Sequence, residues 1–486
     1  MTTHTELEFK FAYDPAVALR LAAEGYDPAL APHRMALRTT YYETPQGALR
    51  AVCTATFQRS VWRVQASRSL VLELSVDEGD LRARAPAYAA HATTPSGPAR
   101  LRAPIAELEI ERISGTRLAF LRWAAQFAVR HQLRLLHASK QEQGMRLCGL
   151  LPALSTPFSA PLAHPASALQ PAHTVAQACA AALQADIGQL LANTAALCQG
   201  LDHDPETVHQ LHIALQRFRT TARAFSLVRQ DRRWRVLVAQ ARAWARTVGQ
   251  ARDADVFATQ SWPAVRETFG TARALPSFTR LVDSYCSRCL GQCRQAFCGP
   301  KVTAFALQAL YLSERLAQGR NAHHQAHPTP TGCDGKVPCR GKGQARFCWK
   351  EPVRHFLQVQ LQHFGQRLHA RLHQAHSAQD WHRARLAAKR LRYTLELALP
   401  VLPGSKRHAR ALHLLAALQH DLGHSNDHAA ARRTARQVAA LASPGAGQAT
   451  QCTRALALVD AWSAHCAAPG TLALAAARQI RRLLHR

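Results

Sequence analysis

The spacing of apolar residues changes along this 486-residue chain. Within residues 1–150, apolar and polar side chains alternate in runs such as 5–11 and 70–76, and alternation of this kind is typical of β-strands. Residues 118–130 instead repeat their apolar positions every three or four residues, which predicts a helix. The pattern therefore predicts an α+β domain over residues 1–150.

From about residue 175 to the end, the helical spacing continues almost without interruption. Ala, Leu, Arg and Gln dominate this region and β-branched residues are sparse, which favours an all-α domain over residues 175–486. Residues 151–174 are rich in Pro, Ser and Ala, and they are predicted to form a linker. Residues 318–352 carry Gly, Pro, His and Cys and are predicted to form an irregular insert within the helical domain.

The helical region contains an internal repeat. The segment that begins at His209 (HQLHIALQRFR) resembles the segment that begins at His382 (HRARLAAKRLRY), which lies 173 positions later. Each is followed by a Gly-x-x-(Arg or Asn)-Asp group, and the aspartates of these groups, Asp253 and Asp427, are 174 positions apart. Two features that recur at nearly the same offset predict a duplicated helical bundle.

Charge narrows the choice of partner for this helical region. The chain has 61 Lys and Arg against 31 Asp and Glu, a formal net charge of +30. Residues 151–486 hold 42 of the basic and 17 of the acidic residues, so most of the excess lies there. An excess of this size predicts a polyanionic partner for the helical domain.

A cationic stripe is predicted on one helix of each repeat. In the second repeat, positions 382, 385, 389, 392 and 396 follow the helical turn, and this stripe includes two Arg and one Lys that would repel one another without an anion. The first repeat has His212 and Gln216 in place of the Arg and Lys, so its stripe is weaker. The alternative is that both stripes are solvated faces with ordinary ion pairs. The residues predicted to bind phosphate are His209, His212, Arg217, Arg219, Arg223, His382, Arg385, Lys389, Arg390 and Arg392.

These motifs resemble the CHAD domain. The resemblance rests on H-x-x-R-x-x-x-K-R-x-R-Y at 382–393, L-Q-x-x-L-G-x-x-N-D at 418–427 and V-G-x-x-R-D-x-D at 248–255. It implies a helical domain of two related four-helix bundles that binds inorganic polyphosphate through His, Arg and Lys on the face between the halves. Asp253 and Asp427 would either orient basic side chains or cap helices.

The N-terminal domain carries acidic and basic side chains on predicted strands. Glu6, Glu8 and Lys10 share one face of a strand because they alternate with apolar residues, and Glu107 and Glu109 repeat this arrangement. Carboxylates coordinate hard divalent cations and a nearby Lys neutralises phosphate charge, so such a face can hold a metal and a phosphate together. The alternative is that each strand merely has a solvated face.

The same domain resembles the CYTH domain, the family of triphosphate tunnel enzymes. The resemblance rests on YYETP at 41–45, on the acidic strand at 104–111 followed by Ser-Gly at 114–115, and on S-K-x-x-x-G-x-R at 139–146. It implies an inorganic triphosphatase that depends on Mg²⁺ or Mn²⁺. The implied metal ligands are Glu6, Glu8, Glu107 and Glu109; the implied phosphate contacts are Lys10, Arg59, Lys140 and Arg146; and the catalytic residues of an active enzyme would be Glu6, Glu8 and Lys10.

One part of the CYTH pattern is missing. After residue 49 the chain runs through Arg59 to a strand pair that resembles a later part of the family's fold, so at least one hairpin of the tunnel is absent. A barrel with fewer strands closes at a smaller diameter or stays open, and it loses phosphate ligands. We therefore expect an incomplete CYTH-like β-tunnel with weak or absent hydrolysis.

Two further expectations concern location and thiols. No apolar run of roughly 18 residues and no leader is present, which favours the cytoplasm, with polyphosphate granules as the expected place of accumulation. The 13 cysteines are scattered and are expected to be reduced. The cysteines at 286, 289 and 293 are interpreted as helix packing, and the His and Cys residues of the insert match no metal framework.

Three functions remain open from the sequence. The first is polyphosphate binding with a CYTH-like module of doubtful activity, and the second is an active metal-dependent inorganic triphosphatase. The third is nucleic-acid binding, which is less favoured because aromatic residues make up only 7% of the chain and only Tyr393 interleaves with the basic stripe. The predicted partners are inorganic polyphosphate and triphosphate, with no membrane.

Overall fold

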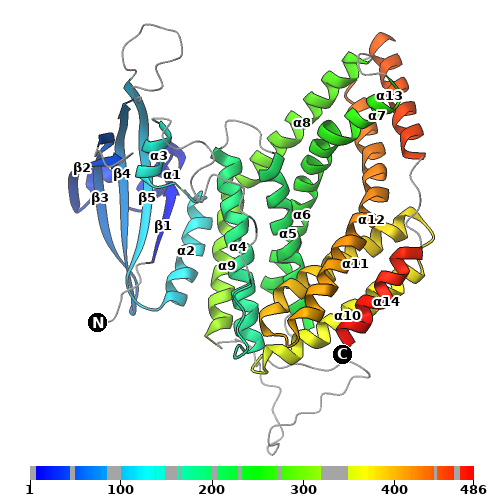
Figure 1. Cartoon of the computed structure of the whole chain (residues 1–486). Coiled ribbons are helices and arrows are strands. Elements are labelled where there is room, and N and C mark those ends of the chain that lie inside the picture. Colours follow the sequence, from blue (N-terminus) through cyan, green and yellow to red (C-terminus); the bar gives the residue numbers. More distant parts are fainter. Residues whose placement is uncertain are drawn as a thin grey trace, which may run out of the picture. The chain divides into compact units, whose positions relative to one another are not determined.

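The computed structural model describes residues 7–43, 50–84, 100–136, 138–147, 163, 167–199, 205–227, 232–270, 275–318, 349–442, 446–464 and 471–485 (Figure 1). The chain divides into two compact units. The first unit comprises Met1–Ala163, Ile187–Gln210 and Arg294–Glu314, and the second comprises His164–Asp186, Leu211–Cys293 and Arg315–Arg486.

The N-terminal part of the first unit is an antiparallel sheet of five strands, in the order β1-β5-β4-β3-β2. Its strands are β1 (Glu8–Ala12), β2 (His33–Glu43), β3 (Arg50–Ser67), β4 (Leu70–Arg84) and β5 (Arg100–Ser114). Strands β1 and β2 are the two edges, so the sheet is open within the described residues. The α+β prediction is confirmed at this level, whereas a closed tunnel is not seen in that part of the chain.

One face of the sheet is apolar and is covered by helices. The helical segments here are α1 (Pro15–Ala22), η1 (Pro28–Leu30) and α2 (Arg117–His131). Phe11, Leu74 and Ile110 are fully buried in this core, because alternate residues of each strand point to the same side of a sheet. Phe120 of α2 is fully buried in the same cluster. Leu307 of the same compact unit joins this core.

The other face carries polar side chains, and helix α3 (Lys140–Leu147) packs against it. Gly144 allows the close approach, because a Cβ atom at this position would lie only 2.1 Å from the Cys53 Sγ atom of β3. Leu147 packs beside Phe57 and Ile105 on the same face. The contacts fix the N-terminus of α3, and therefore Lys140, over strands β4 and β5.

The remainder of the described chain is helical. Its segments are α4 (Val175–Gln199), α5 (Pro205–Ala224), η4 (Phe225–Leu227), α6 (Arg232–Val256), η5 (Phe257–Ser261), α7 (Trp262–Thr268), α8 (Pro276–Phe297), α9 (Pro300–Ala317), α10 (Val353–His373), α11 (Ala378–Ala398), η6 (Leu399–Val401), α12 (Ser405–Ala439), α13 (Ala446–Ala464) and α14 (Thr471–His485). The two motifs of the first repeat lie on α5 and α6, and those of the second lie on α11 and α12.

Local sequence explains where two of these helices start or change. Ser377 caps α11 through a reciprocal pair of hydrogen bonds with Asp380, which begins the helix before its basic residues. Between α6 and α7 the helix widens into one π turn, η5, immediately before Pro263. Pro263, at the second position of α7, has no backbone N–H group to donate, so the regular hydrogen-bond pattern of an α-helix is interrupted there.

Several segment predictions can be compared with these elements. The strands predicted at 5–11 and 70–76 correspond to β1 and to the first half of β4, and the helix predicted at 118–130 corresponds to α2. Glu6, most of the linker 151–174 and most of the insert 318–352 lie outside the described residues. The domain boundaries 1–150 and 175–486 remain a prediction.

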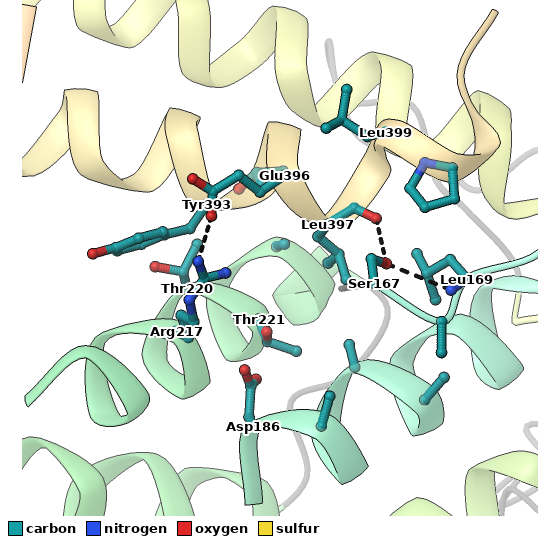
Figure 2. Close-up of a pocket in the computed structure, with 17 residues that line it drawn as sticks. Ser167, Leu169, Asp186, Arg217, Thr220, Thr221, Tyr393, Glu396, Leu397 and Leu399 are labelled. Carbon is teal, nitrogen blue, oxygen red and sulfur yellow. Dashed lines mark hydrogen bonds and ion pairs between the residues drawn. The ribbon is translucent and has the colours of Figure 1, made fainter. Parts of the chain in front are cut away.

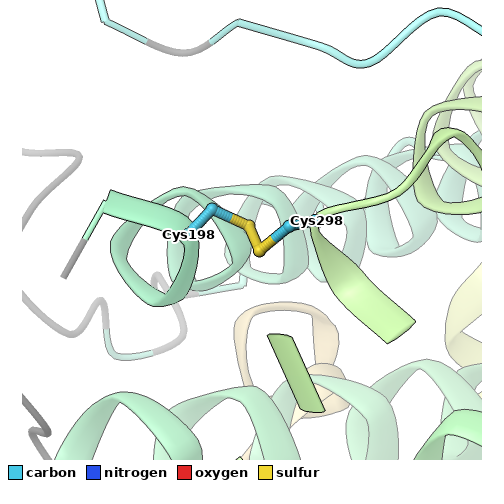
Figure 3. The surroundings of a disulfide bond; sticks show 2 residues. All are labelled: Cys198 and Cys298. Atoms are coloured by element: carbon cyan, nitrogen blue, oxygen red, sulfur yellow. A yellow bond between two sulfur atoms is a disulfide. The ribbon is translucent and has the colours of Figure 1, made fainter. Parts of the chain in front are cut away.

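The expectation of reduced thiols is wrong for one pair. Cys198 at the end of α4 and Cys298 after α8 form a disulfide within the first compact unit (Figure 3). The two cysteines are 100 positions apart in the sequence, so their pairing depends on the tertiary fold and is not visible in local spacing. Cys286, Cys289 and Cys293 are free thiols on α8, as the packing interpretation requires.

No helix in the described ranges is both long enough and apolar enough to cross a lipid bilayer.

Candidate anion-binding site

A basic cavity of about 470 Å³ lies between helices α5, α6 and α11 of the second compact unit. Six of its lining side chains are cationic, and none of the described residues that line it is a carboxylate. The cationic residues are Arg219 and Arg223 of α5, Arg235 and Arg242 of α6, and Lys389 and Arg390 of α11. Opposed helices thus direct positive charge into one space.

A second cavity of about 170 Å³ adjoins the first and shares Arg223 and Arg390 with it. It adds Arg367 and Arg371 of α10 and Arg383 of α11, again without a carboxylate among its described lining residues. We call the cationic residues of the two cavities together the arginine groove.

Helical spacing explains how the groove is assembled. Arg219 and Arg223 are four residues apart on α5, and Arg383 and Arg390 are seven apart on α11, so each pair shares one face of its helix. The pair on α10 is also four residues apart. The pair on α6 is seven residues apart, so four helices each present a short row of guanidinium groups.

The groove residues perturb one another electrostatically. Burial lowers the pKa of Arg390 to about 10, with further lowering by the positive charges of Arg223, Arg219, Arg367 and Arg371. Burial and neighbouring arginines also lower the pKa of Arg219 and of Arg223. Each lowering means that the cationic form is destabilised in the free protein. A bound anion would therefore stabilise the charged forms of these arginines.

The pKa of Lys389, the one lysine among the described residues that line the groove, lies close to neutral pH. Burial lowers its pKa to about 8, and repulsion from Arg385 and Arg392 adds to this effect against the attraction of Asp427 and Asp253. A substantial fraction of Lys389 is therefore neutral slightly above physiological pH.

A second charged cluster lies on the polar face of the N-terminal sheet. Oxygen atoms of Asp77, Glu107 and Glu109 all lie within 4.8 Å of one another, and all three side chains are buried. The Lys140 Nζ atom lies 2.7 Å from Asp77 Oδ2 and 3.2 Å from Glu109 Oε1, and it donates a short hydrogen bond to Glu107. The lysine therefore contacts every member of the acidic group.

Two further cations complete this cluster. Arg59 donates to both carboxylate oxygens of Asp77, at 2.7 and 2.6 Å, and lies 2.6 Å from Glu109 Oε2. Lys10 lies 2.7 Å from Glu109 and 3.0 Å from Glu8. Burial alone would raise the pKa of Glu109, but the hydrogen bond from Lys10 and the charges of the nearby cations outweigh it and lower this pKa to about 2. The cluster is thus a network of ion pairs between three cationic side chains and four carboxylates.

Comparison with known proteins identifies the helical part. A sequence model of the CHAD domain matches residues 181–436, which is more than half of the chain. The chain belongs to the CHAD domain family.

Two solved structures resemble the chain. The crystal structure of the CHAD domain from the plant Ricinus communis is 26% identical, with a TM-score of 0.51, and the match covers 67% of this chain and 96% of that one. PptA from Streptomyces chartreusis is 15% identical with a TM-score of 0.42, and the match covers 64% of this chain and all of that one. No curated protein matches the chain.

The arginine groove lies within the CHAD region and contains four of the residues that the sequence predicts to bind phosphate. These are Arg219 and Arg223 from the first repeat and Lys389 and Arg390 from the second. The two repeats therefore contribute to one cationic surface.

Other predicted residues of the CHAD region point to different partners. Arg217 forms an ion pair with Glu396 and its guanidinium lies 4.7 Å from the centre of the Tyr393 ring. Arg392 lies 2.8 Å from the same Glu396 and donates to Gln419 at 3.2 Å. These arginines thus stabilise the packing of α11 against α5 and α12, and they do not line the groove.

The aspartates of the repeat lie inside helices α6 and α12, so they do not cap helix ends. Asp427 lies 3.8 Å from Arg385, and Asp253 lies 4.0 Å from Arg433. This geometry favours the interpretation in which they orient basic side chains.

The three predicted histidines lie outside the lining of the groove. His209 and His212 are half-buried on α5, where His212 contacts Gln216, and His382 is exposed near the start of α11. They lie on α5 and α11, the helices that carry Arg219, Arg223, Lys389 and Arg390.

Another cavity of the CHAD region, of about 340 Å³, lies between α4, α5 and α11 (Figure 2). Small apolar side chains line most of it, and the Ser167 hydroxyl donates to the Leu397 carbonyl at 2.8 Å across one end. Its charged lining residues are Asp186, Arg217 and Glu396. With two carboxylates against one arginine, this cavity is unsuited to a polyanion.

Sequence reasoning missed five residues of the groove. They are Arg235, Arg242, Arg367, Arg371 and Arg383. The sequence did contain a signal for four of them. The two arginines of α10 are four residues apart and the two of α6 are seven apart, so each pair shares one helix face, but both pairs lie outside the repeated motif.

The N-terminal residues expected to bind metal or triphosphate are only partly described. The structure brings Lys10, Arg59 and Lys140 together with Glu107 and Glu109, and Asp77, which no sequence pattern predicted, joins them. Glu6 and the side chain of Arg146 lie outside the described residues. The CHAD match begins at residue 181, so the CYTH resemblance of the sheet stays a prediction.

Proposed function

We propose that this protein binds inorganic polyphosphate in the arginine groove of its CHAD region. The observation that supports this most directly is the groove itself, in which two adjoining cavities share Arg223 and Arg390 and have no carboxylate among their described lining residues. A linear polymer of phosphates supplies charge to both cavities at once. A single phosphate cannot do this.

The chemistry of the lining fits phosphate oxygens. Guanidinium groups donate two parallel hydrogen bonds to one phosphate, and they keep their charge when partly buried better than an ammonium group does. The groove is rich in Arg and contains one Lys, so most of its positive charge persists across the physiological pH range. Cytoplasmic polyphosphate granules are the expected location of a protein with this site.

The groove is less suited to nucleic acids. Single-stranded nucleic acids gain much of their affinity when bases stack on accessible aromatic side chains. The aromatic residues that line the two cavities are Trp234 and Phe364, and both are buried, with 4% and 5% of their surface exposed. Such a groove recognises phosphate charge without reading bases.

A competition experiment tests this preference. Purified full-length protein should release a labelled long-chain polyphosphate only weakly when duplex DNA or single-stranded RNA is added at equal phosphate concentration and near-physiological salt. Binding of every polyanion weakens with salt, so the salt must be matched between the competitors. Displacement by nucleic acid as efficient as by unlabelled polyphosphate would refute the proposal.

The pKa of Lys389 predicts how the affinity changes with pH. A bound polyanion favours the charged form of Lys389, so the pKa of about 8 in the free protein rises on binding. The contribution of Lys389 to affinity is therefore complete well below pH 8 and is lost as the pH rises above 8. Dissociation constants for polyphosphate measured between about pH 6.5 and 9.5 should rise at the alkaline end.

Lys389→Arg is the matched control for this pH dependence, because it keeps a cation that does not titrate in this range. We expect its affinity to fall much less above pH 8 than that of the wild type, because only the Arg390 guanidinium, with a pKa of about 10, begins to lose charge at the alkaline end. An identical alkaline loss in the wild type and in this variant would show that another group is responsible.

For the N-terminal unit we propose no turnover of triphosphate. Lys10, Arg59 and Lys140, the expected phosphate ligands, are already bound to carboxylates of the same sheet. A triphosphate would have to separate these pairs before it could bind. The arrangement supports the expectation of weak or absent hydrolysis.

A further inference from the structure

Lys140 is held rigidly above the acidic cluster of the N-terminal sheet. It is the first residue of α3, whose start is stabilised by reciprocal hydrogen bonds between Ser139 and Glu142, at 2.8 and 3.1 Å. Gly144 places the same helix directly against β3. Only 8% of the Lys140 surface is exposed, so its ammonium group is fixed within the cluster.

The lysine is charged in this position. Burial would lower its pKa, but the charge of Glu107 and hydrogen bonds to Asp77 and Glu107 outweigh burial and raise the pKa above its ordinary value. A positive charge at this point is needed, because Asp77 and Glu107 have 0% and 2% of their surface exposed and buried carboxylates without a cation are strongly disfavoured.

The same three carboxylates have the spacing that a divalent cation would require. Hard cations such as Mg²⁺ and Mn²⁺ bind carboxylate oxygens, and one oxygen from each of Asp77, Glu107 and Glu109 lies within 4.8 Å of the others. The Lys140 Nζ atom, however, is within hydrogen-bond or ion-pair distance of all three side chains. An ammonium and a metal ion cannot occupy this space together, so the residues as arranged do not fit the metal that the CYTH resemblance implies.

We propose that the Lys140 ammonium takes the position of a divalent cation in this sheet and makes its carboxylate cluster independent of metal. Three cations, Lys10, Arg59 and Lys140, face four carboxylates, so side chains of the sheet and of α3 compensate all but one of the acidic groups without a metal. The carboxylates are those of Glu8, Asp77, Glu107 and Glu109. The N-terminal unit is thus stabilised by an internal cation supplied by its own helix. This inference does not depend on the proposed function of the CHAD region.

The test uses the full chain and Mn²⁺ as the probe. Wild-type protein should bind no Mn²⁺ at this site by calorimetry, and its Tm should be the same in EDTA and in millimolar MnCl₂. Lys140→Met, which removes the charge but keeps much of the side-chain volume, should lower the Tm by about 10 °C in EDTA because it leaves buried carboxylates unpaired. Mn²⁺ should restore most of this loss in the variant alone.

Two further variants make the outcome decisive. Lys140→Met combined with Glu107→Gln removes one carboxylate charge, so it should be more stable in EDTA than Lys140→Met and should respond less to Mn²⁺. Arg102→Gln removes an exposed ion pair of the same sheet, with Asp80, and should behave like the wild type.

Several results would overturn the proposal. One is Mn²⁺ binding by the wild type that Asp77→Asn abolishes. Others are a Lys140→Met variant as stable as the wild type, and a destabilised variant that Mn²⁺ does not rescue. If Lys140→Met does not fold, the double variant with Glu107→Gln and the titration of the wild type still decide the matter. Glu107→Gln should restore folding because it removes one unpaired carboxylate. A double variant that also fails to fold would contradict the role of Lys140 as the counter-charge.

Discussion

Simultaneous replacement of Arg223 and Arg390 by glutamine is expected to weaken the binding of long-chain polyphosphate on the order of 100-fold. These two residues line both cavities of the arginine groove, so their removal takes charge from each. A hydrogen bond to a charged group contributes about 1.5 to 3 kcal/mol, and each 1.4 kcal/mol is a factor of about 10 in affinity. Fluorescence anisotropy with labelled polyphosphate measures the change directly.

The thermal stability of the same variant should be equal to that of the wild type or higher. Burial and neighbouring arginines disfavour the charged forms of both residues in the free protein, so their replacement relieves repulsion and the Tm should not fall. In a plot of the logarithm of the binding constant against the logarithm of the salt concentration, the slope should decrease in magnitude by about one for each phosphate that the variant no longer neutralises.

Arg410→Gln combined with Arg432→Gln is the matched control for charge. Both arginines are exposed on α12 and neither lines the groove cavities, so this pair removes the same net charge from elsewhere in the CHAD region. We expect less than about a threefold change in affinity, since distant exposed charges are largely screened. Equal reductions in the two double variants would mean that net charge alone, and not the groove, retains the polymer.

Removal of the disulfide is expected to lower the free energy of unfolding more than the other substitutions proposed for this protein. Cys198 and Cys298 close a loop of about 100 residues, and loops of this length lose much conformational entropy in the unfolded chain when they are cross-linked. Reduction or Cys298→Ser should therefore lower the free energy of global unfolding of the protein by about 3 to 5 kcal/mol. Urea unfolding followed by circular dichroism, with and without reductant, measures this change.

The control is a protein in which serine replaces both cysteines. Its unfolding curve should match that of the reduced wild type and should not change when reductant is added. An oxidised wild type no more stable than this double variant would show that the bond contributes nothing to stability. Cys198 is exposed, so a soluble reductant reaches the bond without prior unfolding.

Much of the fold could be predicted because the signals for it are local. Alternation identifies β1 and β4, and the three- and four-residue spacing identifies α2 and the helices of the CHAD region. The repeat at an offset of 173 positions predicted that α5 and α11 are related, and both helices line the groove. The open sheet was anticipated only as one of two outcomes, because strand closure depends on partners distant in the sequence.

The groove itself was harder to predict. Spacing on a helix tells which residues share a face, but it does not tell which neighbouring helix that face meets. The spacing therefore grouped Arg385, Lys389 and Arg392 into one stripe. In the fold, Arg385 and Arg392 lie near carboxylates, and Lys389 lines the groove. The α10 arginines were missed because α10 carries no repeated motif.

The N-terminal cluster shows the same limit for strands. Lys10 and Glu109 could be assigned to faces from alternation alone, and they are cross-strand neighbours of β1 and β5. Asp77 faces Glu107 only because β4 pairs with β5 in one alignment, which no local pattern on β4 specifies. The pairing of Lys140 with all three acids depends in turn on how α3 packs on the sheet.

The continuity of the arginine groove has a consequence for how chain length is recognised. Polyphosphate consists of identical units, and Arg223 and Arg390 belong to both cavities, so a chain can shift by one phosphate and regain equivalent contacts. A polymer much longer than the groove then has many degenerate alignments, and each adds a statistical contribution to its affinity. The apparent affinity per molecule should grow roughly in proportion to polymer length, while the affinity per phosphate levels off, so the protein favours long chains without contacting their ends.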